Sequence, residues 1–568
     1  MTTATAAPHG HEPGTGAAHG RAVRRAAVLV ASCVGASFVV WLPSLFAGFT
    51  GDDLEGILRA SADGRRFPGL DYAAVQWRPL SNLSLRFDRT VWGLDASGFH
   101  LTNVVLHGVA AALVAVLAGR LWRTAVKAGG AGTEAELDGR VPPWAPGGLA
   151  AALFLVLPSP SEAVAWVGGR GDLLVAVAAL VSLLAWWTAS EGGDRPDLRW
   201  GAVSVGALAV ALLAKETAAT WPLVLSALEV ARSWSASGDG RWRRAAGAAA
   251  RPWPAYVLVA VWFGTRWAVI GRPLGSYGSD SLLAGGPVGV ARRGASVLVR
   301  SLLPGLPAQG WLVAALLVAG LLGTLAVAAR RPAVRSVLAT WPVAFLPAAM
   351  VLCSLPVLGL GTSASGALGE RLGYLASTFG CVLVAWLLCA LVVHRAAVGW
   401  TAVGLVLAAA LVLCVVAQAR WVAAGSLADR LFESAGQLPR DRPALVLNVP
   451  DERDGTYVAL NALPAALALR HGWTDLTAVW TASTYTQGAD GRTSVVDGPG
   501  PRTWTVRLRG PGARFLQTYD RPAGAQRAAV RVTLRTPRTA RVERGPAPPG
   551  APPESVWAVA DGRLVRRK

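Results

Sequence analysis

The feature that most constrains this chain is a series of apolar segments separated by short charged loops. An apolar helix of about 20 residues matches the thickness of a lipid bilayer. Eleven such segments lie before residue 420, and the apolar runs stop there. We therefore predict a polytopic α-helical membrane protein with about eleven transmembrane helices. The expected spans are residues 26–49, 101–122, 147–166, 172–189, 200–214, 217–231, 254–270, 311–329, 337–358, 375–393 and 397–417.

Basic residues in the short loops predict how these spans are oriented. Three arginines between residues 21 and 25 precede the first span, and the loops near residues 123, 243 and 331 are also basic. Lys and Arg are enriched on the cytoplasmic side of membrane proteins and contact anionic lipids there. The net charge of +20 is thus explained without a nucleic-acid partner. We expect a multi-pass protein of a bacterial inner membrane with a cytoplasmic N-terminus.

The part of the chain after residue 420 has a different pattern. ALVLNVP followed by YVALNALPAALALR predicts a strand and then a helix, and three later segments alternate like strands. The five cysteines all lie in apolar segments without metal-ligand spacing, which is typical of buried hydrophobic residues. The predicted organisation is a disordered cytoplasmic segment 1–25, a transmembrane domain 26–420 with an external loop 50–100, and a soluble extracytoplasmic α/β domain 421–568.

The external loop contains the first candidate catalytic residues. Asp52 and Asp53 directly follow the first span, where the headgroup of a lipid substrate would lie. A carboxylate at this place could accept a proton from a hydroxyl group. It could equally cap the helix expected from Leu54, which is a common role of Asp at a helix start. By spacing alone, capping is the preferred interpretation.

The order of the motifs resembles that of GT-C glycosyltransferases, in particular the branch that contains protein O-mannosyltransferases and the TMTC proteins. The resemblance covers about residues 26 to 420. Neither the tetratricopeptide array of TMTC proteins nor the external β-domain of eukaryotic protein O-mannosyltransferases is found in the sequence. The motifs are the paired acids, WRPLSNLSLRFD from Trp77, WGLDASGFHLTNVVLH from Trp92, SEAVAWVGGRGDLL from Ser161, LLAKETAATWPLVL from Leu212 and ERLGYLAS from Glu370.

The resemblance implies an inverting transferase that moves a sugar from a polyprenyl-phosphate donor to an extracytoplasmic hydroxyl group. The family's donor sugar is mannose, and the acceptor could be a protein, a lipid or a glycan. In such an enzyme Asp52, beside Asp53, would be the base, and Glu162 would be the second acid and would orient the acceptor hydroxyl. Arg371 and Lys215 would neutralise the donor phosphate, for which the planar fork of arginine is well suited.

One departure from the family concerns metal binding. Family members often carry histidines just before the residue equivalent to Glu162, whereas this chain has Leu157 and Pro160 there. We therefore predict no metal site, with an unidentified divalent cation as the open alternative.

Pro158 and Pro160 also predict a break in the third span.

Several charged residues have local interpretations as well. Arg78 would fix the external loop, and His100 and His107 would pack or form hydrogen bonds, because a metal site needs further ligands. Other charged residues are close to a residue of opposite charge in the sequence, and each could form an ion pair with it. These are Arg170 with Asp172, Lys215 with Glu216, and Arg371 with Glu370.

Two other classes of function remain as alternatives. A secondary transporter or channel would carry ionisable residues in the middles of its spans and matched broken helices. Here the charges gather at one outer surface, and no internal repeat is visible. A catalytically inactive relative that binds a partner is the second alternative.

Overall fold

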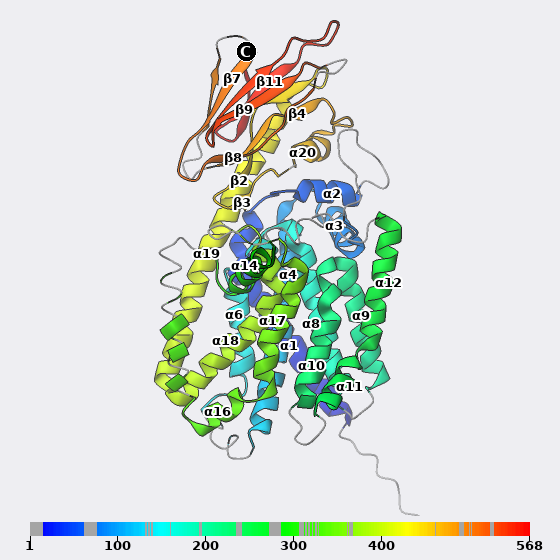
Figure 1. Ribbon diagram of the computed structural model, residues 1–568, viewed down its shortest axis with the longest axis vertical. Helices are drawn as coiled ribbons and strands as arrows, with labels where there is room; N and C mark the ends of the chain where they lie inside the picture. Colours follow the sequence, from blue (N-terminus) through cyan, green and yellow to red (C-terminus); the bar gives the residue numbers. More distant parts are fainter. Residues whose placement is uncertain are drawn as a thin grey trace, which may run out of the picture.

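The computed structural model consists of a helical bundle with a smaller α/β domain at one end (Figure 1). The long helix α19 (Ala396–Ser434) runs along the bundle and continues into this domain. The structure describes residues 15–61, 76–130, 140–159, 161–191, 196–234, 241–271, 286–305, 329–360, 367–460, 462–487, 493–498, 502–522 and 527–567, together with isolated positions between them.

The helices of the bundle lie roughly parallel to its long axis (Figure 1). Their apolar side chains form one large buried core. The principal helices besides α19 are α1 (Thr15–Trp41), α4 (Ala96–Ala128), α6 (Ala145–Val156), α8 (Arg170–Ala189), α9 (Leu198–Ala214), α10 (Trp221–Trp234), α12 (Trp253–Ile270), α17 (Trp341–Ser354) and α18 (Tyr374–His394).

Shorter elements lie at the two ends of the bundle. Those at the end next to the α/β domain hold or adjoin most of the candidate residues. They are η1 (Leu42–Phe46), α2 (Asp53–Ser61), α3 (Pro79–Trp92), α7 (Ser161–Ala165), η2 (Val167–Gly169), η3 (Glu216–Thr220), α14 (Gly286–Arg300), η4 (Leu355–Val357) and η5 (Glu370–Gly373). The opposite end carries α11 (Arg241–Ala250) and α16 (Pro332–Leu338).

Within the described residues, six helices are long and apolar enough to cross a membrane. The count is seven if α16 and the bent segment Trp341–Val357 form one span. The protein is thus a polytopic helical membrane protein, but the expected count of eleven is not confirmed. About half of the positions in the span expected at 311–329 lie outside the described residues, and α6 and α9 are shorter than the usual spanning length. The predicted break in the third span is confirmed, since α6 ends at Val156.

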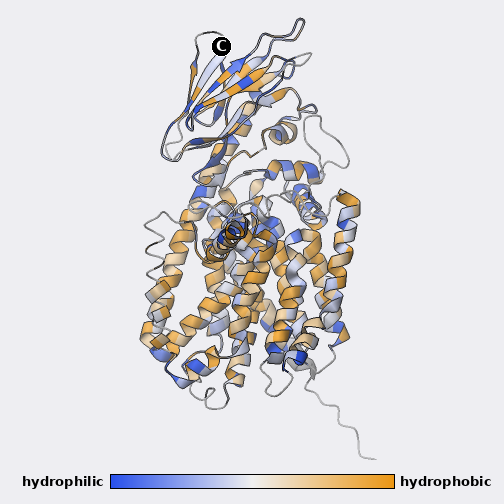
Figure 2. Ribbon diagram, viewed as in Figure 1, coloured by the Kyte–Doolittle hydropathy of each residue, from blue (hydrophilic) through white to orange (hydrophobic). Residues whose placement is uncertain are grey.

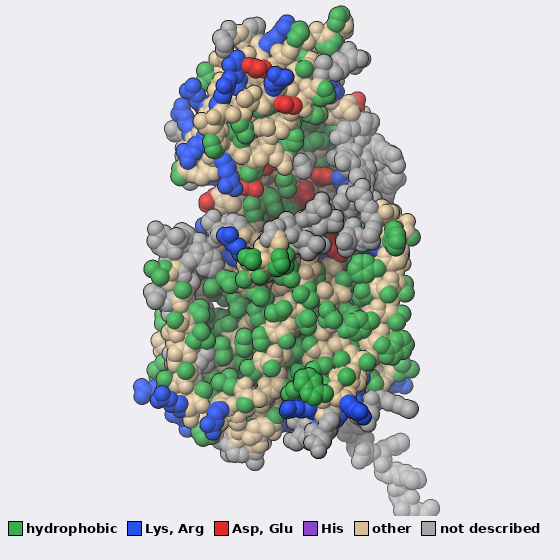
Figure 3. Space-filling view, viewed as in Figure 1, with side chains coloured by type: hydrophobic (Ala, Val, Ile, Leu, Met, Phe, Trp, Pro, Cys, Tyr) green, Lys and Arg blue, Asp and Glu red, His purple; other side chains and the backbone are tan. Residues whose placement is uncertain are grey.

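The helices of the bundle consist mostly of hydrophobic residues along their middle (Figure 2), and hydrophobic side chains cover this part of the face drawn in Figure 3. Lys and Arg side chains gather along the rim opposite the α/β domain (Figure 3). Exposed arginines of α11 and α16 lie at this end. An apolar belt with a basic rim is the pattern of a membrane protein whose two ends face different compartments.

The C-terminal domain contains three four-stranded sheets and the helix α20 (Ala462–His471). The strand orders are β12-β11-β1-β4, β6-β7-β10-β9 and β3-β2-β5-β8. Parallel pairs join β1 to β4 and to β11, and the remaining pairs are mostly antiparallel. The strands are β1 (Ala444–Val446), β2 (Val449–Arg453), β3 (Thr456–Tyr457), β4 (Val479–Thr481), β5 (Ser483–Gln487), β6 (Thr493–Asp497), β7 (Thr503–Leu508), β8 (Arg514–Thr518), β9 (Val530–Thr536), β10 (Thr539–Arg544), β11 (Ser555–Ala560) and β12 (Arg563–Arg567).

The domain packs directly on the short helices at the end of the bundle. Leu54 and Ile57 of α2 share one hydrophobic core with Leu431 of α19 and Leu463 of α20. Burying such side chains contributes about 1.5 to 3 kcal/mol each. Helix α2 and the C-terminal domain are therefore packed together at this end of the bundle.

Candidate active site

A cavity of about 140 Å³ lies at the end of the bundle next to the C-terminal domain. Six ionisable side chains face it, four of them basic and two acidic. Six of the eight residues predicted for the site line this cavity, although they come from segments far apart in the sequence. They are Asp52, Asp53, Arg78, Arg170, Lys215 and Arg371.

The two adjacent acids have different surroundings. The carboxylate of Asp53 accepts hydrogen bonds from the backbone N–H of Thr50 at 2.9 Å and of Gly168 at 2.7 Å. Asp53 therefore ties the loop before α2 to η2. Asp52 is half-buried at the start of α2, and no hydrogen bond fixes its carboxylate to another residue among those described. Asp53 thus has a structural role similar to capping, and Asp52 faces the cavity.

Burial also changes the acidity of these two groups. It raises the pKa of the Asp52 carboxyl, and the positive charges of Arg371, Arg78 and Arg59 limit this rise. Burial raises the pKa of Asp53 as well, against the two backbone hydrogen bonds that favour its ionised form. A carboxylate with a raised pKa is a better proton acceptor than one that is fully solvated.

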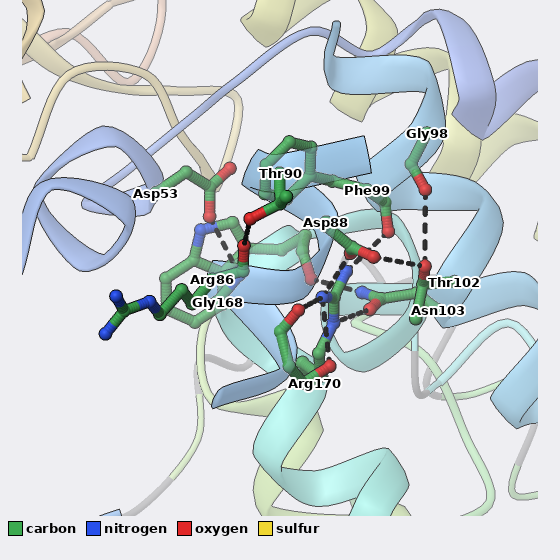
Figure 4. Close-up of polar contacts among 12 residues, drawn as sticks. Asp53, Arg86, Asp88, Thr90, Gly98, Phe99, Thr102, Asn103, Gly168 and Arg170 are labelled. Atoms are coloured by element: carbon green, nitrogen blue, oxygen red, sulfur yellow. Dashed lines mark hydrogen bonds and ion pairs between the residues drawn. The ribbon is translucent and has the colours of Figure 1, made fainter. Parts of the chain in front are cut away.

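Arg170 is the centre of a buried network beside the cavity (Figure 4). Its guanidinium is paired with Asp88 of α3 and donates from Nε to Asn103 Oδ1 at 2.9 Å and from Nη2 to the Phe99 carbonyl at 2.6 Å. The expected local pair with Asp172 is wrong. Residues two positions apart in a helix point in different directions, so Arg170 and Asp172 cannot face each other. Arg170 instead fixes α3 and α4 to the start of α8.

Lys215 and Glu216 also pair with distant residues rather than with each other. Lys215 Nζ lies 2.6 and 2.7 Å from the two carboxylate oxygens of Asp172. Arg78 binds Glu216 through two hydrogen bonds of 2.5 and 3.0 Å. Against the effect of burial, the charge of Arg78 and these hydrogen bonds lower the pKa of the Glu216 carboxyl to about 2. Lys215 is itself buried. The expectation that Arg78 fixes the external loop agrees with this contact.

Arg371 and Glu370 likewise pair with residues from distant segments and not with each other. The guanidinium of Arg371 is paired with Glu162, whose carboxylate also accepts from the Arg371 backbone N–H at 2.9 Å. Glu370 is paired with Arg300 of α14 at 2.6 Å, so the expected Arg371–Glu370 pair is wrong. Glu162 is fully buried and is not among the residues that line the cavity. Burial raises its pKa, and the charge of Arg371 opposes this.

The two histidines form hydrogen bonds, as predicted. His100 Nε2 donates to the Gly48 carbonyl at 2.9 Å, and His107 Nδ1 lies 2.8 Å from the Tyr374 hydroxyl. His100 therefore supports the loop below Asp52 without facing the cavity. Among the described residues, no three His, Cys, Asp or Glu side chains gather in a way that could hold a metal ion.

Sequence reasoning missed three residues of this site. Trp166 lies beneath Arg371, with the guanidinium carbon 4.7 Å from the centre of its ring. Asp88 is the partner of Arg170, and Tyr457 reaches the site from the C-terminal domain. Asp88 could have been found, because it lies on the same helical face as Ser81 and Leu85 and is buried with them.

Comparison with known proteins gives relatives over part of the chain. No protein-family model matches. The chain is 37% identical to protein O-mannosyl-transferase Tmtc2 of Drosophila melanogaster over 228 residues, which are 36% of this chain and 22% of that protein. It is 34% identical to Tmtc1 of the same organism over 218 residues, with coverages of 35% and 22%. TMTC4 of Mus musculus matches at 34% over 154 residues, with coverages of 25% and 19%.

Among solved structures, the chain resembles ArnT from Cupriavidus metallidurans bound to undecaprenyl phosphate. The TM-score is 0.42 at 16% identity, with 83% of this chain and 96% of that chain covered. The matched part spans about a fifth of the length of the curated relatives. The named relatives nevertheless confirm the resemblance that the motifs indicated. About a third of the chain is similar to the TMTC protein O-mannosyl-transferases, the branch that the motifs resembled.

Proposed function

We propose that this protein is an inverting membrane glycosyltransferase. It moves a sugar from a polyprenyl-phosphate donor to a hydroxyl group of an extracytoplasmic protein, lipid or glycan. Mannose is the first candidate for this sugar. The observation that carries the proposal is the cavity that Asp52, Arg78, Lys215 and Arg371 line together. A proton acceptor and several cations at the edge of an apolar bundle are what such a transfer requires.

In this reaction Asp52 is the base. As the acceptor oxygen attacks the anomeric carbon, its proton passes to the Asp52 carboxylate. The bond from the anomeric carbon to the phosphate oxygen breaks, and the bonding electrons leave with the phosphate. A single displacement inverts the anomeric configuration, because the acceptor attacks from the face opposite to the phosphate.

The cations stabilise the charge that develops on the leaving phosphate. Arg78, Lys215 and Arg371 face the cavity, whereas their partners Glu216, Asp172 and Glu162 do not line it. The carboxylates thus hold each cation in a fixed position from outside the cavity, so that its N–H groups act as charged hydrogen-bond donors at the cavity wall. Fixed charges of this kind favour the transition state without reorganisation during the reaction. We accordingly assign Glu162 the role of positioning Arg371.

The test is transfer by the purified full-length protein in liposomes. The probe is polyprenyl-phosphate mannose with a radiolabelled sugar, offered together with hydroxyl-containing peptides, glycolipids and glycans. We expect labelled product and free polyprenyl phosphate, with inverted anomeric configuration by NMR. Retained configuration would overturn the single displacement. Binding of polyprenyl phosphate without transfer to any acceptor class would instead favour the inactive binding relative.

We also propose that the site faces the extracytoplasmic side of an inner membrane, with the N-terminus in the cytoplasm. The support is the basic rim at the end opposite the C-terminal domain (Figure 3). Single cysteines at positions 243 and 480 can be labelled with an impermeant reagent in intact cells. We expect labelling at 480 and not at 243, and the reverse pattern would refute this orientation.

A further inference from the structure

The C-terminal domain reaches the candidate site through one β-hairpin. Strands β2 and β3 are joined by Asp454 and Gly455, which adopt φ values of 47° and 75°. An Asp-Gly pair with positive φ at both residues is typical of a tight two-residue hairpin turn. The hairpin lies on the side of the domain that faces the bundle (Figure 1).

The backbone of this hairpin and of the residue after it forms hydrogen bonds with two loops of the site. The Gly51 N–H donates to the Val458 carbonyl at 3.1 Å, and the Ala367 N–H donates to the Gly455 carbonyl at 3.0 Å. Gly51 adjoins the proposed base, and Ala367 lies in the loop that leads to the proposed phosphate-binding arginine. One hairpin therefore connects the segment next to the proposed base with the segment that leads to the proposed phosphate-binding arginine.

The side chain of Tyr457 extends this connection to the charged groups. Its ring lies 5.1 Å from that of Trp166 and 6.4 Å from that of Trp421, measured between ring centres. Arg371 lies over the ring of the same Trp166, with its guanidinium carbon 4.7 Å from the ring centre, so Tyr457 and Arg371 contact one tryptophan. Burial raises the pKa of Tyr457 to about 12, so the hydroxyl stays neutral near pH 7 and can take part in a hydrogen bond. The nearby Arg371 side chain lowers the pKa of the Tyr457 hydroxyl, in opposition to burial.

The close approach of the hairpin depends on Gly51. This residue has a φ of 58°, and a Cβ there would lie 3.0 Å from Trp166 Nε1 and 3.2 Å from Tyr457 Cβ. Both contacts are tighter than ordinary van der Waals contacts, so only glycine fits without a shift of its neighbours. The loop before Asp52 therefore packs closely against both Trp166 and Tyr457.

We propose that Tyr457 is a positioning residue of the glycosyl-transfer site. Its hydroxyl and ring hold the Arg371 guanidinium against Trp166, so that the C-terminal domain completes the phosphate-binding side of the cavity. This inference rests on the proposed function for the identity of the donor. It assigns the domain a part in the site itself, in addition to any role in the choice of acceptor.

The test is binding of a polyprenyl monophosphate to the purified full-length protein in detergent, which requires no turnover. Tyr457→Phe keeps the ring and removes the hydroxyl. We expect its affinity for the phosphate to fall by about 2-fold to 10-fold, the range for one net hydrogen bond. Tyr519→Phe in the same domain is the matched control, because that hydroxyl contacts Gln517 and should leave the affinity unchanged.

A double variant tests whether Tyr457 acts through Arg371. In an Arg371→Lys background, the further change Tyr457→Phe should weaken binding by less than about 2-fold, since contacting residues are not additive. Full additivity would overturn the positioning role. Unchanged affinity in Tyr457→Phe with a lowered melting temperature would also overturn it and leave Tyr457 a structural role.

The same experiment separates this inference from the proposed reaction. If the wild-type protein transfers no sugar but Tyr457→Phe still weakens phosphate binding, the reaction fails and the positioning role stands. If transfer and phosphate binding of Tyr457→Phe both equal those of the wild type, the reaction stands and the positioning role fails.

Discussion

The two ends of the helical bundle use basic residues in different ways. Next to the C-terminal domain, Arg170 and Lys215 are buried, and each is held by a carboxylate from another segment. At the opposite end, the arginines of α11 and α16 are exposed to solvent. A buried ion pair fixes the position of an atom, whereas exposed charges mainly determine which side of the membrane a loop occupies. Substitutions should therefore be costly at the first end and tolerated at the second.

The largest effect is expected at the proposed base. Asp52→Asn keeps the shape of the side chain and removes the proton acceptor, so transfer should slow by about 10²-fold to 10⁴-fold. Binding of polyprenyl phosphate should persist, because the cations remain. The measurement is transfer in liposomes at equal protein content.

Asp53→Asn is the matched control for this change. The Asp53 carboxylate accepts two backbone hydrogen bonds, so the substitution should lower the melting temperature more than it lowers transfer per folded molecule. Full activity of Asp52→Asn would return Asp52 to its capping role.

The second effect concerns the buried network around Arg170. Arg170→Met leaves the Asp88 carboxylate buried without its cation, and breaking a buried pair in this way costs about 3 to 5 kcal/mol. We expect a clearly lower melting temperature in detergent. A variant as stable as the wild type would show that this pair is dispensable and would remove the contrast between the two ends.

The third effect is a dependence of transfer on pH. The base works in its deprotonated form, and burial raises the pKa of Asp52. The rate should therefore rise about tenfold per pH unit below this pKa and level off above it. The midpoint should lie above the ordinary aspartate value of about 3.9. In Asp52→Asn this rise should be absent, and its persistence would point to another base.

The smallest effect is expected at the opposite end of the bundle. Arg243→Gln and Arg335→Gln remove exposed charges, and such changes usually alter stability by less than about 0.5 kcal/mol. Transfer and melting temperature should stay within error of the wild type. A large loss of stability in either variant would contradict the division between the two ends.

Six of the eight candidate residues line the cavity. The sequence also predicted the membrane class, the helix break near Pro158 and the C-terminal strands. These predictions succeeded because apolar length, alternation and proline act locally. The count of spans was not confirmed, since several helices are shorter than a regular span. All three expected ion pairs between sequence neighbours were wrong, because each of these residues pairs with an opposite charge from a distant segment that packs beside it.

The sequence by itself determined that apolar helices would form, that an α/β part would follow them, and that acids and cations would lie near the ends of the apolar segments. Only the tertiary structure decided which carboxylate holds each cation. Arg371 and its partner Glu162 are 209 positions apart. It also decided that Tyr457 of the C-terminal domain lies against Trp166. Such contacts depend on how distant elements pack, and no local pattern of residues encodes that packing.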